Sequence, residues 1–196
     1  MALVKSIAGN EICDAVARNA QVGGRNLLRY TDFKDASKWN KNNGATISNG
    51  IGTISANSGK QVELYRKDAV SGKAGDKFTF SVNVLTNTLS GGDGFKFYVW
   101  CVGKKSDGSA YNTWPIGDKL STNFTGVYSY TWTIPSGVTI TKLGIDMDAY
   151  NCTSGTATVN HYKIERGDKA TDWTPALEDT LTMTDDNNGN VTISIL

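Results

Sequence analysis

Histidine, cysteine and proline are scarce in this sequence, which has 196 residues but only one histidine, three cysteines and three prolines. The histidine is His161, and Cys13, Cys101 and Cys152 lie far apart with no Cys-x-x-Cys pair among them. A structural zinc site needs about four nitrogen or thiolate ligands, so this set predicts none. We expect small buried thiols, and a Cys101–Cys152 disulfide is the alternative that the sequence leaves open.

Neither an excess of one charge nor a long apolar run is present. The chain has 20 basic and 19 acidic residues, a formal net charge of +1, whereas binding to a nucleic acid backbone needs a basic patch or stripe. No run of about 18 apolar residues occurs, so no transmembrane helix is expected. The first residues, MALVKSIAGNEICDAV, have one lysine and a broken apolar stretch, which is not the pattern of a signal peptide. We therefore expect neither nucleic acid nor membrane as a partner.

The motifs of common enzymes are also missing. The sequence has no Gly-x-Ser-x-Gly, no His-Glu-x-x-His and no glycine-rich phosphate loop with a lysine. Asp146 and Asp148 share one face of a predicted strand, but a solvated pair is expected rather than two acids facing each other across a cleft. His161 is expected to be an exposed strand residue. No catalytic residue is predicted, and no cofactor is expected. A structural calcium ion, whose ligands the sequence does not identify, stays open as an alternative.

Strand-forming residues and turns are abundant. The chain has 21 glycines, 8 tyrosines and 5 tryptophans, with frequent serine, threonine and valine, a composition typical of short strands joined by turns. Apolar residues alternate with others in KFTFSVNVL (77–85) and FKFYVWCV (95–102). Alternation places one set of side chains on the buried face of a strand. The residues predicted to point inward are Phe78, Phe80, Phe95, Phe97 and Val99.

The same alternation recurs farther along the chain, in VYSYTWTI (127–134), VTITKLGIDMDAY (138–150) and TATVNHYKIE (156–165). Eight or so such strands, with no helical segments between them, predict an all-β fold, namely an antiparallel two-sheet β-sandwich of the jelly-roll type. In the first of these runs four residues share a face and are expected to belong to the core. They are Tyr128, Tyr130, Trp132 and Ile134.

Two short segments flank this body. Residues 1–24 contain EICDAVARNAQV, which is predicted to form a short helix with one narrow apolar stripe. Residues 25–178 form the sandwich, and residues 179–196 are predicted to form a hairpin around Asn188-Gly189. A single short helix or an isolated hairpin is marginal in water. We therefore expect both segments to make contacts between chains.

Characteristic sequences bracket the strand-rich body. They are GRNLLRYTDFKDASKWN (24–40) and KIERGDKATDWTPALED (163–179). Residues 24–178 resemble the carbohydrate-binding-module-like jelly-roll domains of phage tail and baseplate proteins from Gram-positive hosts. The opening motif, an Asn-Leu-Leu followed by Asp-Phe and Trp, is shared with carbohydrate-binding modules of bacterial glycosidases. The closing motif, Glu-x-Gly-x-x-Ala-Thr-Asp-Trp-Thr-Pro, is the more specific of the two.

The two motifs also have a structural interpretation. Leu27 and Leu28 are expected to start the first strand, with Phe33 and Trp39 folding back as apolar plugs at one end of the sandwich. Trp173 is expected to seal the chain beside that strand. The proline that follows two residues later cannot donate a backbone hydrogen bond and would end strand pairing there.

Outward-facing aromatic residues indicate where a saccharide could bind, because sugar rings stack on flat aromatic faces and their hydroxyls need polar neighbours. Tyr98 and Trp100 lie on the strand face opposite Phe97, and the segment SAYNTWPIGD adds two more aromatic residues. Packing of Trp100 under that segment, with Trp114 as a plug at the rim, is the alternative. The predicted carbohydrate-binding residues are Lys96, Tyr98, Trp100, Tyr111, Asn112, Trp114 and Asp118.

The resemblance implies a non-catalytic virion protein of a tail, baseplate or fibre whose jelly-roll domain binds host cell-surface carbohydrate. Its expected partners are host cell-wall polysaccharide, other virion proteins and further copies of itself. A trimer is favoured because phage fibres and baseplates are commonly trimeric. The expected location is the virion, after synthesis in the host cytoplasm. The alternative is a purely architectural virion or decoration protein without glycan binding.

Overall fold

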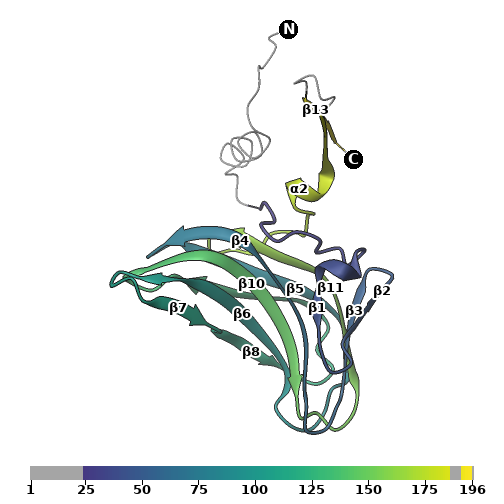
Figure 1. Cartoon of the computed structure of the whole chain (residues 1–196). Helices are drawn as coiled ribbons and strands as arrows, with labels where there is room; N and C mark the ends of the chain where they lie inside the picture. Colours follow the sequence, from purple (N-terminus) through teal and green to yellow (C-terminus); the bar gives the residue numbers. More distant parts are fainter. Residues whose placement is uncertain (1–23, 186–190, 196) are drawn as a thin grey trace.

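The computed structural model describes residues 24–185 and 191–195. In this part of the chain two antiparallel sheets pack face to face as a β-sandwich (Figure 1), so the predicted fold class is confirmed. The predicted N-terminal helix and the Asn188-Gly189 turn lie outside the described residues. No described helix is long and apolar enough to cross a membrane.

One sheet, called the groove sheet below, has the strand order β1-β4-β10-β6-β7, with β8 also paired to β6. Figure 1 shows β4, β10 and β6 as long, curved neighbours, with β10 between the other two. This central strand therefore presents its outward side chains between those of two partners. The strand bounds are β1 Asn40–Lys41, β4 Gln61–Lys73, β6 Gly94–Lys105, β7 Ala110–Thr113, β8 Ile116–Leu120 and β10 Val138–Tyr150.

The other sheet, called the second sheet, has the order β2-β3-β11-β5-β9. Its bounds are β2 Thr46–Ser48, β3 Ile51–Ser55, β5 Lys77–Asn87, β9 Gly126–Thr133 and β11 Thr156–Arg166. The other elements are a 3₁₀ turn η1 Ala36–Lys38, helix α2 Leu177–Thr180, and a separate strand pair, β12 Leu181–Asp185 with β13 Val191–Ile195.

The core lies between the sheets and follows the predicted alternation. Phe78, Phe80, Phe97 and Val99 are completely buried, and Phe95 is 1% exposed. In β9 the predicted core face is only partly enclosed, because this strand lies at the edge of the second sheet. Its two tyrosines are half-buried against the core, whereas its tryptophan and the isoleucine that follows are buried.

The opening segment departs from the prediction, since Leu27 and Leu28 do not start a strand. The buried side chain of Asn26 organises this segment instead. Its Nδ2 donates to the carbonyl oxygens of Tyr162 (3.0 Å) and Thr174 (3.1 Å), and its Oδ1 accepts from the amide of Leu28 (3.1 Å). A side-chain amide can satisfy backbone groups that a strand ladder would otherwise pair. The chain is thus tied to its closing segment without a strand.

Aromatic residues close this end of the sandwich, as predicted. Phe33 and Trp39 are buried and pack on Tyr162, with ring centroids 5.0 and 5.1 Å away. Trp173 donates from Nε1 to the carbonyl oxygen of Tyr162 (3.2 Å) and stacks on His161 at a centroid distance of 4.1 Å. The prediction of an exposed His161 is therefore wrong, because the closing tryptophan half-buries the imidazole.

The closing motif also forms a polar cluster on β11. Lys163 and Glu165 are 0% and 1% exposed and form an ion pair of 3.6 Å. Lys163 Nζ donates to Thr171 Oγ1 (2.7 Å), and the Thr171 amide donates to Glu165 Oε1 (2.8 Å). The glutamate and the threonine of the motif are thus direct partners, which gives their spacing a structural reason.

The hairpin predicted near the C-terminus is present as the antiparallel pair β12 and β13. Helix α2, just before it, is joined to the opening segment by an ion pair between Arg25 and Glu178 and by a bond from the Tyr30 amide to Asp179 Oδ2. Cys101 and Cys152 are buried free thiols, so the alternative disulfide is not formed, and burial raises the pKa of Cys101 to about 12.

Candidate functional site

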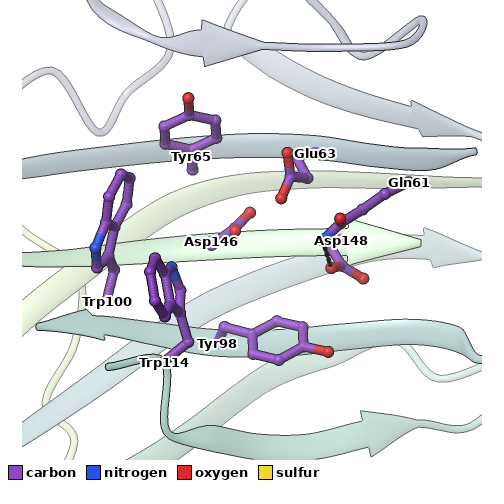
Figure 2. Close-up of a pocket in the computed structure, with 8 residues that line it drawn as sticks. All are labelled: Gln61, Glu63, Tyr65, Tyr98, Trp100, Trp114, Asp146 and Asp148. Atoms are coloured by element: carbon purple, nitrogen blue, oxygen red, sulfur yellow. Dashed lines mark hydrogen bonds between the residues drawn. The ribbon is translucent and has the colours of Figure 1, made fainter. Parts of the chain in front are cut away.

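The outer face of the groove sheet contains a cavity of about 350 Å³, called the groove below. Figure 2 shows that its side chains come mainly from three adjacent strands, with β10 in the middle and one tryptophan contributed by the β7–β8 connection. The groove therefore depends on the register of strands that are far apart in the sequence. It is lined by Gln61, Glu63, Tyr65, Tyr98, Trp100, Trp114, Asp146 and Asp148.

Strand register sets the arrangement of these residues. Asp146 lies opposite Tyr65 on β4 and Tyr98 on β6, and Asp148 lies opposite Glu63 and Lys96. Successive side chains of a strand point to opposite faces, so residues two apart on β10 share the outer face with these partners. Rings and carboxyl groups thereby become direct neighbours across the sheet.

The aromatic end of the groove is a stack of rings. Trp114 is 45% exposed and stacks on Trp100 with centroids 5.7 Å apart and an interplanar angle of 27°. Trp100 is held by a bond from its Nε1 to Asn112 Oδ1 (3.1 Å), and Lys67 Nζ lies 3.5 Å from its ring centroid. Trp100 therefore supports the stack, while Trp114 offers the open aromatic surface.

A glycine makes room for the contact between the lysine and the indole. Gly144 lies between Lys67 and Trp100 in the register of the three strands. A Cβ atom at this position would come within 2.7 Å of Lys67 Cβ and 2.3 Å of the Arg66 carbonyl oxygen. The position is therefore restricted to glycine by close packing, and any larger residue would displace the lysine that covers the ring.

The carboxyl groups of the groove are sunk in its floor. Asp146 and Asp148 are 5% and 1% exposed, so the prediction of a solvated pair is wrong. Their strand is central, and side chains from both neighbouring strands cover them (Figure 2). Among the described residues Oδ1 of each has no hydrogen-bond partner, while Asp148 Oδ2 accepts from Gln61 Nε2 (2.6 Å). Burial, with Glu63 nearby, raises the pKa of Asp146 well above its usual value and that of Asp148 to about 6.

The structure brings only some of the predicted site residues together. Tyr98, Trp100 and Trp114 line the groove. Lys96 lies across from Asp148 and forms an ion pair with Asp93 (2.8 Å). The other three residues have different positions. Asn112 holds the Trp100 indole, Tyr111 packs against the core, and Asp118 accepts from the Tyr128 hydroxyl at 3.0 Å.

Five lining residues were not among the predicted binding residues. Gln61, Glu63 and Tyr65 alternate with buried Val62 and Leu64 in QVELYRK, so alternation was a signal that marked this stretch as a strand. The other two, Asp146 and Asp148, were recognised as sharing a strand face, but their burial was not foreseen.

The groove combines an open aromatic face, which can stack on the flat apolar side of a ligand, with carboxyl and amide groups that can hydrogen-bond its polar groups. Within residues 24–185 and 191–195 no three His, Cys, Asp or Glu side chains are grouped so that they could hold a metal ion.

Sequence comparison finds no matching protein family and no curated protein with significant similarity. In structure, the chain is similar to the enzymatically active domain of tailspike protein 4 from bacteriophage CBA120, with 11% identity over 72% of this chain and 21% of that one and a TM-score of 0.49. It is also similar to the baseplate tripod of bacteriophage Tuc2009, with 20% identity over 79% of this chain and 59% of that one and a TM-score of 0.46.

A third similar structure is the CBM22-1–GH10 part of a Clostridium thermocellum xylanase in complex with xylohexaose, with 13% identity over 78% of this chain and 30% of that one and a TM-score of 0.47. This chain thus spans from about a fifth to about three fifths of the length of these three proteins.

Proposed function

We propose that this chain is a non-catalytic phage virion protein whose β-sandwich binds host cell-wall carbohydrate in the groove. One observation carries the proposal. An exposed indole, Trp114, lies in the same cavity as two aspartates whose Oδ1 atoms lack a hydrogen-bond partner among the described residues, on the outer face of a sheet. A sugar ring would cover the apolar indole while its hydroxyls supply the missing hydrogen bonds.

Stacking geometry favours a small set of residues for this role. Trp114 would be the platform, with Trp100 fixing its orientation from below. Tyr65 on β4, which packs on Trp100, and Tyr98 on β6 would line the two sides of the groove floor, and Gln61 would bond to hydroxyls at the far end. A short oligosaccharide bound by one such platform should have an affinity near millimolar, about −4 kcal/mol. Several copies in one particle would strengthen attachment to a repetitive surface.

Assembly into a virion is the second half of the proposal. The motifs in residues 24–40 and 163–179 resemble those of phage tail and baseplate domains. The β12–β13 hairpin forms a two-stranded sheet separate from the sandwich, and such a pair is marginal without a partner surface. Contacts with other copies, in a trimer, or with other virion proteins would provide that surface.

Glycoside hydrolysis is the competing activity that the groove suggests, because buried carboxyls with raised pKa values occur in active sites. Asp146 and Asp148 are two apart on one strand, so they lie side by side on the floor. Two acids that flank a scissile bond need to face it from different sides. Binding without cleavage is therefore the better account.

The test is a pull-down of the full chain on purified Gram-positive cell wall, with reducing-sugar release measured in parallel. The parent protein should bind and release no sugar, and Trp114→Ala should remain folded but lose most binding. Val127→Ala is a matched control, because Val127 is 67% exposed on the second sheet. Equal retention of parent and Trp114→Ala would contradict groove binding, and released reducing ends would contradict the non-catalytic role.

A further inference from the structure

The charge of the groove is one-sided. Glu63 on β4 lies opposite Asp148 on β10, and Asp146 is on the same face two residues along. The lysine that faces Asp148 from β6, Lys96, is already paired with Asp93 at 2.8 Å. Three carboxyl groups therefore share one small cavity. Of the two lysines beside it, Lys96 is engaged by another acid and Lys67 covers the Trp100 ring.

Two of these carboxyls are buried without a full set of partners. Asp146 is 5% exposed and Asp148 is 1% exposed, and both line the cavity. Oδ1 of each lacks a hydrogen-bond partner within residues 24–185 and 191–195. Burying a carboxylate is costly unless it is paired with a cation or fully hydrogen-bonded. A positively charged group arriving in the groove would offset that cost, whereas an anionic group would increase it.

The aromatic wall of the groove is also suited to a cation. Tyr65, Tyr98, Trp100 and Trp114 line the same cavity as the carboxyls. Lys67 Nζ lies 3.5 Å from the Trp100 ring centroid, so the protein already places one ammonium on this wall. Aromatic faces attract ammonium groups through the ring quadrupole. Rings and carboxyls side by side are more selective for a cation than either would be alone.

We infer, resting on the proposed function, that the groove selects saccharides carrying a free amino group. The ammonium would bind among Glu63, Asp146 and Asp148 while the sugar ring stacks on Trp114. An N-acetylated sugar lacks the positive charge, and a sugar bearing carboxylate or phosphate meets repulsion from the same acids. The groove would thus rank amino sugars above neutral sugars and neutral sugars above anionic ones.

The preference should depend on pH, because the carboxyls attract an ammonium only when ionised. Burial raises the pKa of Asp148 to about 6, so this group is largely ionised at pH 7 and largely protonated at pH 5. Affinity for the amino sugar should therefore fall below about pH 6 as Asp148 is protonated, and also at alkaline pH as the amino group of the sugar loses its proton, while affinity for a neutral sugar should change less. The titratable or charged groups facing the two aspartates are Glu63, Tyr65 and Lys67 on β4, Lys96 and Tyr98 on β6, Asp93 before β6, and Tyr162 on β11.

The experiment is isothermal titration calorimetry of the full chain with two probes, a β-1,4-linked glucosamine tetrasaccharide and its fully N-acetylated counterpart. At pH 7 the amino form should bind at least about tenfold more tightly. Glu63→Gln and Asp148→Asn remove charge with little change of shape, so they should weaken binding of the amino probe severalfold more than binding of the acetylated probe and thereby reduce that ratio. Asp168→Asn, which removes an exposed acid paired with Lys77 away from the groove, is the matched control and should keep the parent ratio.

The outcomes separate this inference from the proposed function. Equal binding of both probes, or tighter binding of the acetylated one, would overturn the amino-sugar preference and leave carbohydrate binding in place. Failure of both probes would also overturn the preference, and the cell-wall pull-down would then decide the proposed function by itself. A ratio that survives in both Glu63→Gln and Asp148→Asn would show that these carboxyls are not its source.

Discussion

On the outer face of the second sheet polar side chains of neighbouring strands bond to one another, whereas on the floor of the groove they do not. Thr86 and Thr158 share a hydroxyl bond of 2.7 Å, and Asn83 Nδ2 donates to Asn160 Oδ1 at 2.9 Å. In the groove, by contrast, Oδ1 of Asp146 and Oδ1 of Asp148 are buried without a partner in the part of the chain that the structure describes. Satisfied polar groups stabilise a fold, and unsatisfied buried ones mark a place where a ligand can supply the missing partner.

The largest loss of stability is expected from breaking a buried ion pair on the second sheet. Lys163→Met should lower the free energy of unfolding by about 3–5 kcal/mol, because it leaves the buried carboxylate of Glu165 without its cation. Denaturant unfolding would measure the loss. The double variant Lys163→Met, Glu165→Gln should recover much of it, and a loss below about 1 kcal/mol in the single variant would show that the pair is not needed.

Replacing the two groove tryptophans should distinguish the residue that holds the ring stack in place, Trp100, from the one proposed to contact the ligand, Trp114. Trp114→Ala should reduce cell-wall binding about tenfold or more with little loss of stability, because its ring is 45% exposed. Trp100→Ala should weaken binding and also destabilise the fold by about 1–3 kcal/mol, because Lys67, Tyr65 and Trp114 all pack on that ring. Thermal unfolding and pull-down on the same preparations would test this, and equal stability losses in the two variants would contradict the assignment.

The buried acid should give the groove a distinctive pH dependence. The pKa of Asp148 is raised to about 6 in the folded protein, against about 3.9 in an unfolded chain, so the folded state binds the proton more tightly. Its contribution to stability is therefore fully present below about pH 4 and is lost as pH rises to about 6. Asp148→Asn should remove that loss and be more stable than the parent at pH 7 by about 1–2 kcal/mol. Unfolding of both proteins at pH 4, 5, 6 and 7 measures the difference, and parallel curves would refute the prediction.

The smallest effect is expected where polar groups are exposed and already paired. Thr86→Val should change stability by less than about 0.5 kcal/mol and leave cell-wall binding unchanged, because both hydroxyls of the pair can bond to water instead. A binding defect in this variant, measured by the same pull-down, would indicate that the second sheet also contacts the ligand.

Alternation in the sequence was enough to predict the sandwich and its core, since Phe78, Phe80, Phe95, Phe97 and Val99 are buried as expected. Period-two patterns report which face of a strand a residue occupies, and that much depends only on local sequence. The expectation that Leu27 starts a strand is wrong, because the Asn26 side chain takes the place of strand pairing in this segment. Its hydrogen bonds go to residues more than 130 positions away, which local sequence does not reveal.

The groove was harder to predict because it is a product of register. Tyr98 and Trp100 were identified by their outward parity and Trp114 by its place in a neighbouring loop segment. Gln61, Glu63 and Tyr65 of β4, by contrast, enter the site only because that strand pairs with β10. The same pairing buries Asp146 and Asp148, which as an isolated sequence resemble a solvated pair. Tyr111 is the opposite case. It was predicted to bind carbohydrate because it is close in sequence to Trp114, but it packs against the core.

Titration of cell-wall fragments into isotope-labelled protein, followed by the indole N–H signals of its five tryptophans, tests the central claim most directly. Trp100 and Trp114 line the groove, whereas Trp132 is buried in the core and Trp173 closes the other sheet on His161. If the groove binds carbohydrate, the signals of Trp100 and Trp114 should shift with added ligand and those of Trp132 and Trp173 should stay in place. Movement of the Trp173 signal with Trp100 and Trp114 unchanged would contradict the account.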